Sequence, residues 1–318
     1  MKVVFFGTPG CAVPYLQAVR DAGGELVAVV TQPDRPRGRS GQLCPPPVKE
    51  EAAGLQVCLL QPESCRDPLL IAEVEEQGPD IALVIAFGQI LCPELLSVPR
   101  VASLNVHYSL LPRFRGAAPV QHALLAGLKE TGVTLQHISP RLDAGDIVAQ
   151  ARLDIAEEDD TQSLTERLTA LGCQLVREFL PRAMAGTAPR EPQDESQATL
   201  APRLTKQDGL IDWRQNAVQI ANRVRAVTPW PGAATAVGGQ RLLIRKVRTW
   251  PDRAGEPGQI LEWPTAAGRG PVVAAGRGAV ELLTVQPEGK RAMAGADYLR
   301  GARLSRSDAF VSLAVEHN

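Results

Sequence analysis

Residues 104–146 read LNVHYSLLPRFRGAAPVQHALLAGLKETGVTLQHISPRLDAGD, and the rest of the chain is organised around this stretch. At its start, Val101, Leu104 and Val106 have the spacing of a buried strand. Side chains two positions apart on a strand point the same way, so Asn105 and His107 should leave the strand together at its carboxyl end. Taken alone, Asn-x-His is more often a strand end with incidental polar residues than a catalytic pair.

Three side chains of this stretch have the chemistry of an acyl transfer. The Asn105 amide and a protonated His107 can stabilise the negative oxygen of a tetrahedral intermediate. The Asp143 carboxylate can orient or charge the histidine and move the proton of a nucleophile. Because the chain has only four histidines, one that lies two residues from an asparagine after an apolar run suggests a catalytic role.

Strands and helices alternate on the N-terminal side of this stretch. Apolar runs at 2–7, 26–30, 57–60 and 81–86 are typical of buried strands, and 13–22 and 67–77 of helices. We therefore predict an α/β fold with a doubly wound, mostly parallel, Rossmann-like sheet, whose ligands lie at the carboxyl ends of the strands. The turn at 7–10 lacks a complete Gly-x-Gly-x-x-Gly and gives little support to a dinucleotide site.

On the C-terminal side, a strand is expected at 147–155 and a long amphipathic helix at 162–184. Residues 186–202, GTAPREPQDESQATLAP, are rich in proline and polar residues and indicate a linker. A helix near 218–226 and five or six short strands then predict a small β-barrel of the oligonucleotide-binding (OB) type. We place the catalytic domain at 1–185, the linker at 186–207 and the OB-like domain at 208–318.

The composition, 44% apolar and 22% charged over 318 residues, is that of a globular protein long enough for two domains. Residues 1–203 carry 18 Lys and Arg against 25 Asp and Glu, whereas residues 204–318 carry 16 against 10. The basic second half points to a polyanion, and chance variation in surface charge explains it about equally well. The six cysteines form no Cys-x-x-Cys pair, so no zinc site is expected. Met1 leads directly into a strand and no apolar run approaches a membrane span, so we expect a cytoplasmic protein.

A basic segment, TQPDRPRGRSGQLCPPPVK at 31–49, connects the second strand to the next helix. It is too long and irregular for a routine connection. Its arginines Arg35, Arg37 and Arg39 suit a polyanionic substrate, and a solvated loop without a role is the alternative.

Motifs along nearly the whole chain resemble those of the methionyl-tRNA formyltransferase family. In order, they are GTP near the start, TQPDRPRGR, NVH followed by SLLPRFRGAAP, ETGVT, LDAGD, LTKQDGLIDW, TPWPG and VQPEGKRAM. One such motif would mean little, whereas all of them in order are highly specific. The resemblance implies a formyl-folate-binding domain followed by an OB-type barrel. It also implies transfer of the formyl group of 10-formyltetrahydrofolate to the amine of methionyl initiator tRNA, for translation initiation.

The resemblance carries family roles to particular residues. Asn105 and His107 would stabilise the oxyanion, and Asp143 would hold His107 or relay protons. Folate contacts are implied for Ser109, Leu110, Leu111, Pro112, Phe87 and Gly88. Contacts with tRNA are implied for the loop residues Arg35, Arg37 and Arg39 and expected for Arg223, Arg245, Lys246 and Lys290. We expect no metal ion, no DNA or membrane partner, and a monomer.

One departure from the family pattern and two other functions stay open. Tyr108 replaces a small residue or proline and would narrow or reshape the mouth of the folate pocket. A folate-dependent formyltransferase that acts on a small amine would share the Asn-His-Asp residues without needing a second basic domain. A non-catalytic RNA-binding protein would not need Asn105, His107 and Asp143.

Overall fold

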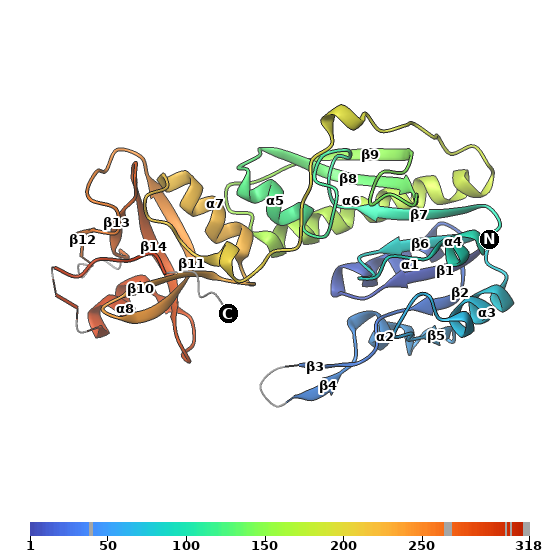
Figure 1. Ribbon diagram of the computed structural model, residues 1–318, viewed down its shortest axis with the longest axis horizontal. Helices are drawn as coiled ribbons and strands as arrows, with labels where there is room; N and C mark the ends of the chain where they lie inside the picture. The colour runs from blue at the N-terminus through green and yellow to red at the C-terminus, as the bar shows by residue number, and fades with distance from the viewer. Residues whose placement is uncertain (38–40, 264–268, 303, 306, 314–318) are drawn as a thin grey trace. The chain divides into compact units, whose positions relative to one another are not determined.

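The computed structural model describes residues 1–37, 41–263, 269–302, 304–305 and 307–313 (Figure 1). Its packing divides the chain into two compact units. The first unit comprises 1–116, 130–154 and 165–201, and the second comprises 117–129, 155–164 and 202–318. Two short segments, 117–129 and 155–164, therefore belong with the C-terminal residues rather than with their neighbours in sequence.

A seven-stranded sheet with the strand order β5-β2-β1-β6-β7-β8-β9 forms the centre of the first unit. Its strands are β1 Lys2–Gly7, β2 Glu25–Val30, β5 Cys58–Leu60, β6 Ile81–Ile85, β7 Ala102–His107, β8 Glu130–His137 and β9 Ile147–Asp154. The five strands from β5 to β7 run parallel, and β8 and β9 are antiparallel to their neighbours. This confirms the predicted α/β fold with a mostly parallel sheet.

The helices of this unit are α1 Val13–Asp21, α2 Pro47–Ala52, α3 Pro68–Gln77, α4 Pro93–Ser97 and α6 Thr161–Met184. Three of them, α1, α3 and α6, lie where the sequence predicts them, and α2 and α4 were not predicted. Helix α3 begins after Asp67, whose side chain accepts a hydrogen bond from Leu69 N, and it ends at Gly78 in the left-handed conformation. All five residues of β6 are buried, which explains its continuous apolar sequence. A small hairpin, β3 Arg35–Arg37 with β4 Gln42–Cys44, lies within the basic loop.

The second unit is built on an antiparallel sheet with three helices. Its elements are α5 Pro119–Leu125, α7 Ala217–Val227, β10 Ala233–Val237, β11 Gln240–Trp250, β12 Ile260–Glu262, β13 Val272–Ala274, β14 Ala279–Pro287, β15 Met293–Ala294 and α8 Gly295–Gly301. A capping box between Asn216 and Gln219 fixes the start of α7. The core of the unit contains the rings of Trp213 and Phe310, whose centroids are 5.6 Å apart.

The predicted closed barrel is not confirmed. Among the described strands the order is β10-β11-β14-β13-β12, with β15 beside β14, so β10 and β12 do not pair directly. Strand β12 has only three residues and its pairing with β13 shifts register, which leaves little backbone for closing a barrel. The coarser prediction, a second domain rich in β-strands, matches the structure, although β11 and β14 are longer than the short strands expected.

Among the residues that the structure describes, no helix has both the length and the apolar character needed to cross a bilayer.

Candidate active site

Strand β7 brings Asn105 and His107 to one face of the sheet, as its alternation predicts. Across β8, Asn105 lies opposite Gln136 and His107 lies opposite Thr134. Residues paired across two strands share a face of the sheet, so all four side chains belong to the same surface. Val101, in contrast, precedes the strand and is 38% exposed, so its assignment to the buried strand is wrong.

His107 and Asp143 meet although 35 residues separate them in the sequence. His107 Nδ1 lies 3.7 Å from Asp143 Oδ2, and the His107 side chain is 7% exposed against 13% for Asp143. The other ring nitrogen, Nε2, donates a hydrogen bond of 2.9 Å to the Phe114 carbonyl. Nδ1 is therefore the nitrogen that faces the carboxylate.

Asp143 is held by both of its carboxylate oxygens. Oδ2 accepts a hydrogen bond from Gly116 N at 2.8 Å, and Oδ1 accepts one from Gln136 Nε2 at 3.2 Å. Its backbone has φ +48°, in the left-handed region, which costs a non-glycine residue roughly 1–2 kcal/mol. Two positions on, a Cβ on Gly145 would stand 1.7 Å from the His137 carbonyl oxygen, so only glycine fits there.

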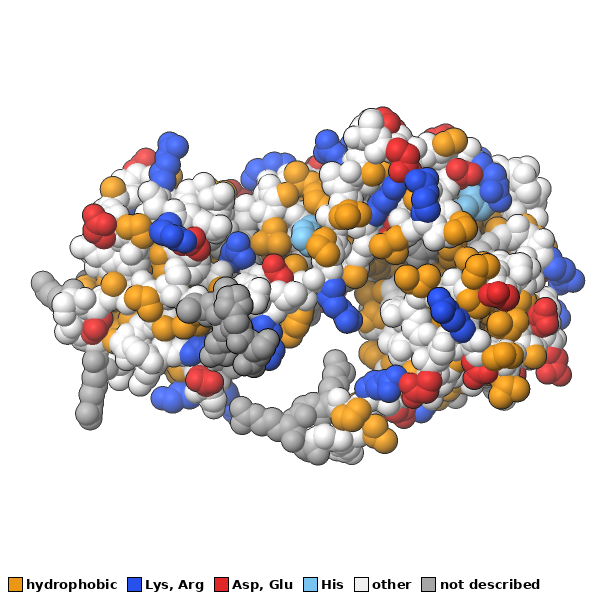
Figure 2. Space-filling view, viewed as in Figure 1, with side chains coloured by type: hydrophobic (Ala, Val, Ile, Leu, Met, Phe, Trp, Pro, Cys, Tyr) orange, Lys and Arg blue, Asp and Glu red, His pale blue; other side chains and the backbone are white. Residues whose placement is uncertain are grey.

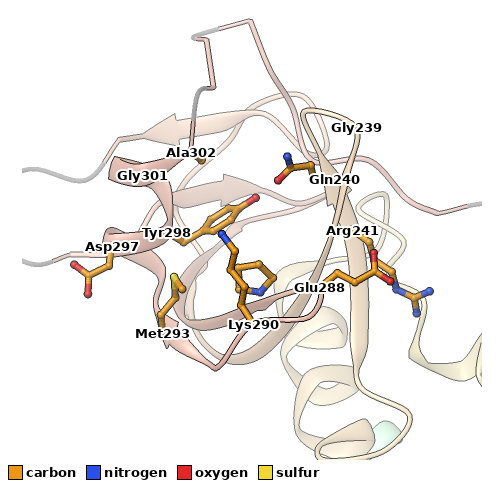
Figure 3. A pocket seen from close by; sticks show the side chains of 11 residues that line it. Gly239, Gln240, Arg241, Glu288, Lys290, Met293, Asp297, Tyr298, Gly301 and Ala302 are labelled. Carbon is orange, nitrogen blue, oxygen red and sulfur yellow. The ribbon is translucent and has the colours of Figure 1, made fainter. Parts of the chain in front are cut away.

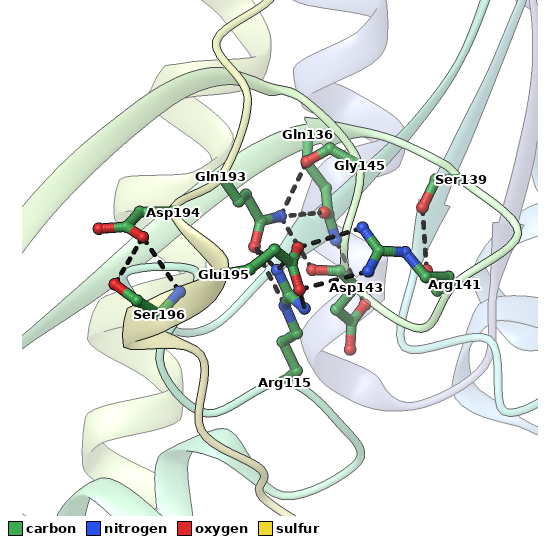
Figure 4. A network of polar contacts seen from close by, with 10 residues as sticks. All are labelled: Arg115, Gln136, Ser139, Arg141, Asp143, Gly145, Gln193, Asp194, Glu195 and Ser196. Carbon is green, nitrogen blue, oxygen red and sulfur yellow. Dashed lines mark hydrogen bonds and ion pairs between the residues drawn. The ribbon is translucent and has the colours of Figure 1, made fainter.

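A polar network behind Asp143 includes residues that the sequence analysis did not select (Figure 4). Gln193, from the predicted linker, donates to Asp143 O at 2.9 Å and to Gly145 O at 2.8 Å. Arg115 binds the Gln193 side-chain oxygen and forms an ion pair with Glu195. Gln136 gave no distinct signal, because its strand, ETGVTLQH, contains several other polar residues. Nothing in the sequence around 193–195 distinguishes these residues from an ordinary linker.

His137 contributes no positive charge beside this loop near neutral pH. Burial lowers its pKa below the ordinary value of 6.5, and the nearby Arg190 acts in the same direction. The charged side chains around the Asp143 turn are the Asp143 carboxylate, Arg115 and Arg141 with Glu195, and Asp146 with Arg190.

The segment predicted to contact folate, Ser109–Pro112, is tied to β8 and β9. Thr134 Oγ1 donates to Ser109 O at 2.7 Å and accepts from Leu111 N at 3.1 Å. Gln150 Nε2 donates to Leu111 O at 2.8 Å. The Ser109 hydroxyl donates to Arg113 O and is fully buried, so its side chain stabilises the loop. These hydrogen bonds fix the backbone of the loop that follows β7.

The other predicted folate residues, Phe87 and Gly88, follow β6 and differ in exposure. The Phe87 ring is 2% exposed and packs edge-on against Phe6, with ring centroids 5.4 Å apart. Its side chain therefore belongs to the core, and its carbonyl accepts a hydrogen bond from Thr8 Oγ1. Gly88 is exposed, with φ +94°, and its nearest neighbour on the side where a Cβ would stand is Gln32 Cγ at 4.0 Å.

The Tyr108 side chain points into the first unit rather than toward a pocket mouth. Its hydroxyl forms hydrogen bonds with Thr169 Oγ1 at 2.8 Å and with the Tyr15 hydroxyl at 3.3 Å. Burial raises its pKa well above the ordinary value. Tyr108, which directly follows β7, thus has its hydroxyl bound within the first unit.

The three arginines predicted to bind tRNA from the basic loop differ in how far the structure describes them. Arg35 forms an exposed ion pair with Glu63, with 2.6 Å between Nη2 and Oε2. Arg37 ends strand β3. Arg39 lies outside the described residues.

Of the four residues of the second unit predicted to bind tRNA, the two arginines are hydrogen-bonded to protein groups and the two lysines are exposed. Arg223 donates to Asp208 O at 2.6 Å, and Arg245 binds Gln286 Oε1 and Pro229 O. Lys246 and Lys290 are exposed. Lys290 lies on the edge of a cavity of about 670 Å³ that Arg241, Met293 and Tyr298 also line (Figure 3). On the face shown in Figure 2, Lys and Arg side chains of this unit are interspersed with acidic and uncharged ones.

Among the described residues, no group of three His, Cys, Asp or Glu side chains is arranged to hold a metal ion. This observation leaves the predicted absence of a metal untested.

Comparison with known proteins places these residues in a family. The formyl transferase family matches residues 1–180, and the formyl transferase C-terminal domain matches 203–303. The chain is 45% identical to the methionyl-tRNA formyltransferase of Moorella thermoacetica over 95% of its own length and 96% of that protein. Identity to the Geobacter metallireducens enzyme is 43%, over 96% of each chain.

A solved structure supports the fold independently. HypX from Aquifex aeolicus in complex with tetrahydrofolic acid matches 94% of this chain and 46% of its own, with 18% identity and a TM-score of 0.61. At this identity the likeness speaks for the fold alone. The two domain matches and the full-length relatives together show that the chain belongs to the methionyl-tRNA formyltransferase family.

Proposed function

We propose that the chain transfers the formyl group of 10-formyltetrahydrofolate to the amino group of methionyl initiator tRNA. The observation that carries this proposal is the approach of His107 Nδ1 to Asp143 Oδ2 at 3.7 Å, beside Asn105 on the end of β7. The relatives at 43–45% identity, named for this activity and matched over nearly their whole length, support the same substrates.

The chain's own groups fit a folate at the carboxyl ends of β6 and β7. Gly88 presents bare backbone, against which a flat ring can lie closely. Gln32 Nε2, beside this turn, is buried and has no hydrogen-bond partner among the described residues. The Ser109–Pro112 loop supplies backbone groups held in place by Thr134 and Gln150. Apolar walls with a few fixed polar groups are what a small flat ligand requires.

Each polar residue then has one task in the reaction. When bound, 10-formyltetrahydrofolate would supply the formyl carbon. As the amine nitrogen bonds to that carbon and the carbon–N10 bond breaks, Asn105 and His107 stabilise the charge that develops on the formyl oxygen. Asp143 takes part in moving the proton that the amine loses and N10 gains. An amino ester is largely neutral near pH 8, so modest assistance from a base suffices.

The second unit would bind the tRNA. Two isolated β-bridges near the end of the chain support an OB-like barrel. Val311 bridges to Ala236 of β10, and Ala309 bridges to Gln259, the residue before β12. Exposed Lys246 and Lys290 can neutralise phosphates, whereas Arg223 and Arg245 are already engaged with protein groups. The loop arginines Arg35, Arg37 and Arg39 would contact the acceptor stem.

We also propose a monomer that works in the cytoplasm without a metal ion. The predicted domain limits, 1–185, 186–207 and 208–318, stay part of the proposal, with the segments 117–129 and 155–164 packing on the C-terminal domain.

Transfer of labelled formyl from 10-formyltetrahydrofolate to purified methionyl initiator tRNA tests this function. Methionyl elongator tRNA and free methionine serve as controls. We expect product on the initiator tRNA only. Folate turnover with a small amine and none with tRNA would keep the chemistry and overturn the substrate.

A further inference from the structure

Residues 191–201 are fastened to the first unit at both ends, although their composition is that of a linker. At one end, Glu191 and Ile147 exchange backbone hydrogen bonds of 2.8 and 3.0 Å. At the other end, Arg115 N donates to Thr199 O at 2.8 Å, and Ala201 N donates to Arg115 O at 2.7 Å. The segment is therefore a strap across the loop that carries Asp143.

Gln193 lies between these two anchors and reaches the backbone of the Asp143 turn (Figure 4). Its Nε2 donates to Asp143 O at 2.9 Å and to Gly145 O at 2.8 Å, and it lies 3.2 Å from Gln136 Oε1. Gln136 is in turn the residue that binds Asp143 Oδ1. One amide group thus contacts both the backbone of Asp143 and the residue that holds its carboxylate.

Arg115 and Glu195 fix the direction of the Gln193 amide. Arg115 Nε and Nη2 donate to Gln193 Oε1 at 3.1 and 2.7 Å. The same guanidinium binds both Glu195 oxygens, at 2.9 and 3.1 Å, and its side chain is only 8% exposed. A rigid fork paired in this way sets its own orientation. The amide oxygen of Gln193 must then face Arg115, and its nitrogen must face the Asp143 turn.

We propose that Gln193 is a positioning residue for Asp143, held in that role by the Arg115–Glu195 ion pair. This inference rests on the proposed function of Asp143. Asp143 stands in the left-handed region, with φ +48°, so its backbone needs an external partner to stay there. The Gln193 donor satisfies the Asp143 carbonyl, and the contact between Asp143 and His107 depends on that conformation. A small displacement of a catalytic group is enough to reduce the rate of a reaction.

Two substitutions of Gln193 separate positioning from packing. Gln193→Met removes the donor and acceptor while keeping the length of the side chain. Gln193→Glu keeps the acceptor for Arg115 but sets a carboxylate oxygen against two carbonyl oxygens. We expect kcat to fall roughly 10- to 100-fold in both, with KM for folate and tRNA within about threefold of wild type. Activity within about twofold of wild type in Gln193→Glu would overturn the proposal.

Gln197→Met is the matched control, because Gln197 lies on the same strap, is exposed and binds only Asp194 in the hydrogen bonds of its side chain that the structure describes. We expect its kcat to equal that of wild type. A loss equal to that of Gln193→Met would show that disturbing the strap anywhere lowers activity, and would overturn a specific role for Gln193.

A double-mutant cycle tests whether Gln193 acts through Asp143. In an Asp143→Asn background, Gln193→Met should change kcat by less than about twofold, because the group that it positions is already disabled. The same fold loss in both backgrounds would contradict the proposal.

Hydrogen exchange of the backbone amides of 141–146 needs no substrate and separates this inference from the proposed function. We expect faster exchange there in Gln193→Met than in Gln197→Met. Equal exchange would overturn the positioning role. If wild-type protein transfers no formyl group to methionyl-tRNA, the proposed function fails, and the exchange experiment still decides whether Gln193 holds the turn.

Discussion

Arg115 in the first unit and Lys246 in the second carry the same charge in different surroundings. The Arg115 side chain is 8% exposed, and its guanidinium binds Gln193 and Glu195 beside the loop that carries Asp143. Lys246 is exposed on β11, at a point where the register with β14 shifts. The first cation is buried within a connected network that ends at the half-exposed Glu195, whereas the second faces water.

This difference determines how each region responds to a substitution. Removing a buried side chain such as Arg115 leaves its partners without hydrogen bonds in a region with little water, so effects there are large and specific. At the exposed end of the same network, solvent screens Glu195 and effects are small. On the basic surface, each cation contributes little, salt screens the contributions, and they add up across several residues. Substitutions in the two regions should therefore differ in the size of their effects, which decrease from Asp143→Ala to Glu195→Gln.

Asp143→Ala should abolish measurable turnover, with a fall in kcat of about 10³-fold or more and little change in folding. The carboxylate is the group that meets His107 Nδ1 at 3.7 Å. Single-turnover formyl transfer and thermal melting measure the two effects. Asp146→Ala is the control, since Asp146 lies on the same turn and faces Arg190 at 3.9 Å. Near-normal activity in Asp143→Ala would refute the assigned role.

Gly145→Ala should lower kcat about 100-fold and destabilise the fold by about 2 kcal/mol, although it removes no functional group. The added Cβ would stand 1.7 Å from the His137 carbonyl oxygen, which is backbone and cannot swing away. Gly54→Ala is the control, because the contact there is an ordinary 3.6 Å. Steady-state kinetics and denaturant unfolding of both variants measure the two effects. Equal kcat and equal unfolding free energy in Gly145→Ala and Gly54→Ala would show that the turn is not tightly packed.

Lys246→Ala and Lys290→Ala should each raise KM for tRNA by about two- to threefold, with kcat and KM for folate unchanged. Combining them should multiply the effects, because exposed cations act independently. Measuring tRNA binding from low to high salt should show a shallower dependence in the double variant. An effect on tRNA as large as that of Asp143→Ala on kcat would contradict the contrast between the two regions.

Glu195→Gln should show a small, pH-dependent loss of thermal stability. Hydrogen bonding from Arg115 lowers the pKa of Glu195 below its ordinary value of 4.5. A carboxyl whose pKa is lower in the folded state stabilises the fold above its unfolded pKa, and this stabilisation is lost as the pH falls through the folded pKa. The Tm of wild type should therefore exceed that of Glu195→Gln at pH 6, and the gap should narrow below pH 4.5.

The effect should be modest because the Glu195 side chain is 49% exposed and solvent screens it. Glu178→Gln, at an exposed position of α6, controls for loss of a surface carboxylate. A Tm gap that stays constant from pH 6 to pH 3 would rule out the ion pair as its cause.

Sequence by itself determined most strands of the parallel sheet, the helices α1, α3 and α6, and the shared face of Asn105 and His107 on β7. These features depend on local patterns. Alternation along residues 102–107 puts Asn105 and His107 on one face, and Pro68 and Gly78 set the limits of α3 wherever that helix lies. Motif order across the chain indicated the family. Neither local pattern nor motif order predicted that the Phe87 ring and the Tyr108 hydroxyl are buried, because neighbours in space decide this.

Only the tertiary structure decided how Asp143 is held. Gln193 lies 78 residues from Arg115 and 50 from Asp143 in the sequence. The segment around it is rich in proline and polar residues, which gave no sign of a role. Nor could short strand patterns decide whether the second sheet closes. The physical reason is that strand and helix patterns arise from neighbouring residues. Hydrogen bonds between distant segments exist only once packing has brought their donors and acceptors together in a buried place.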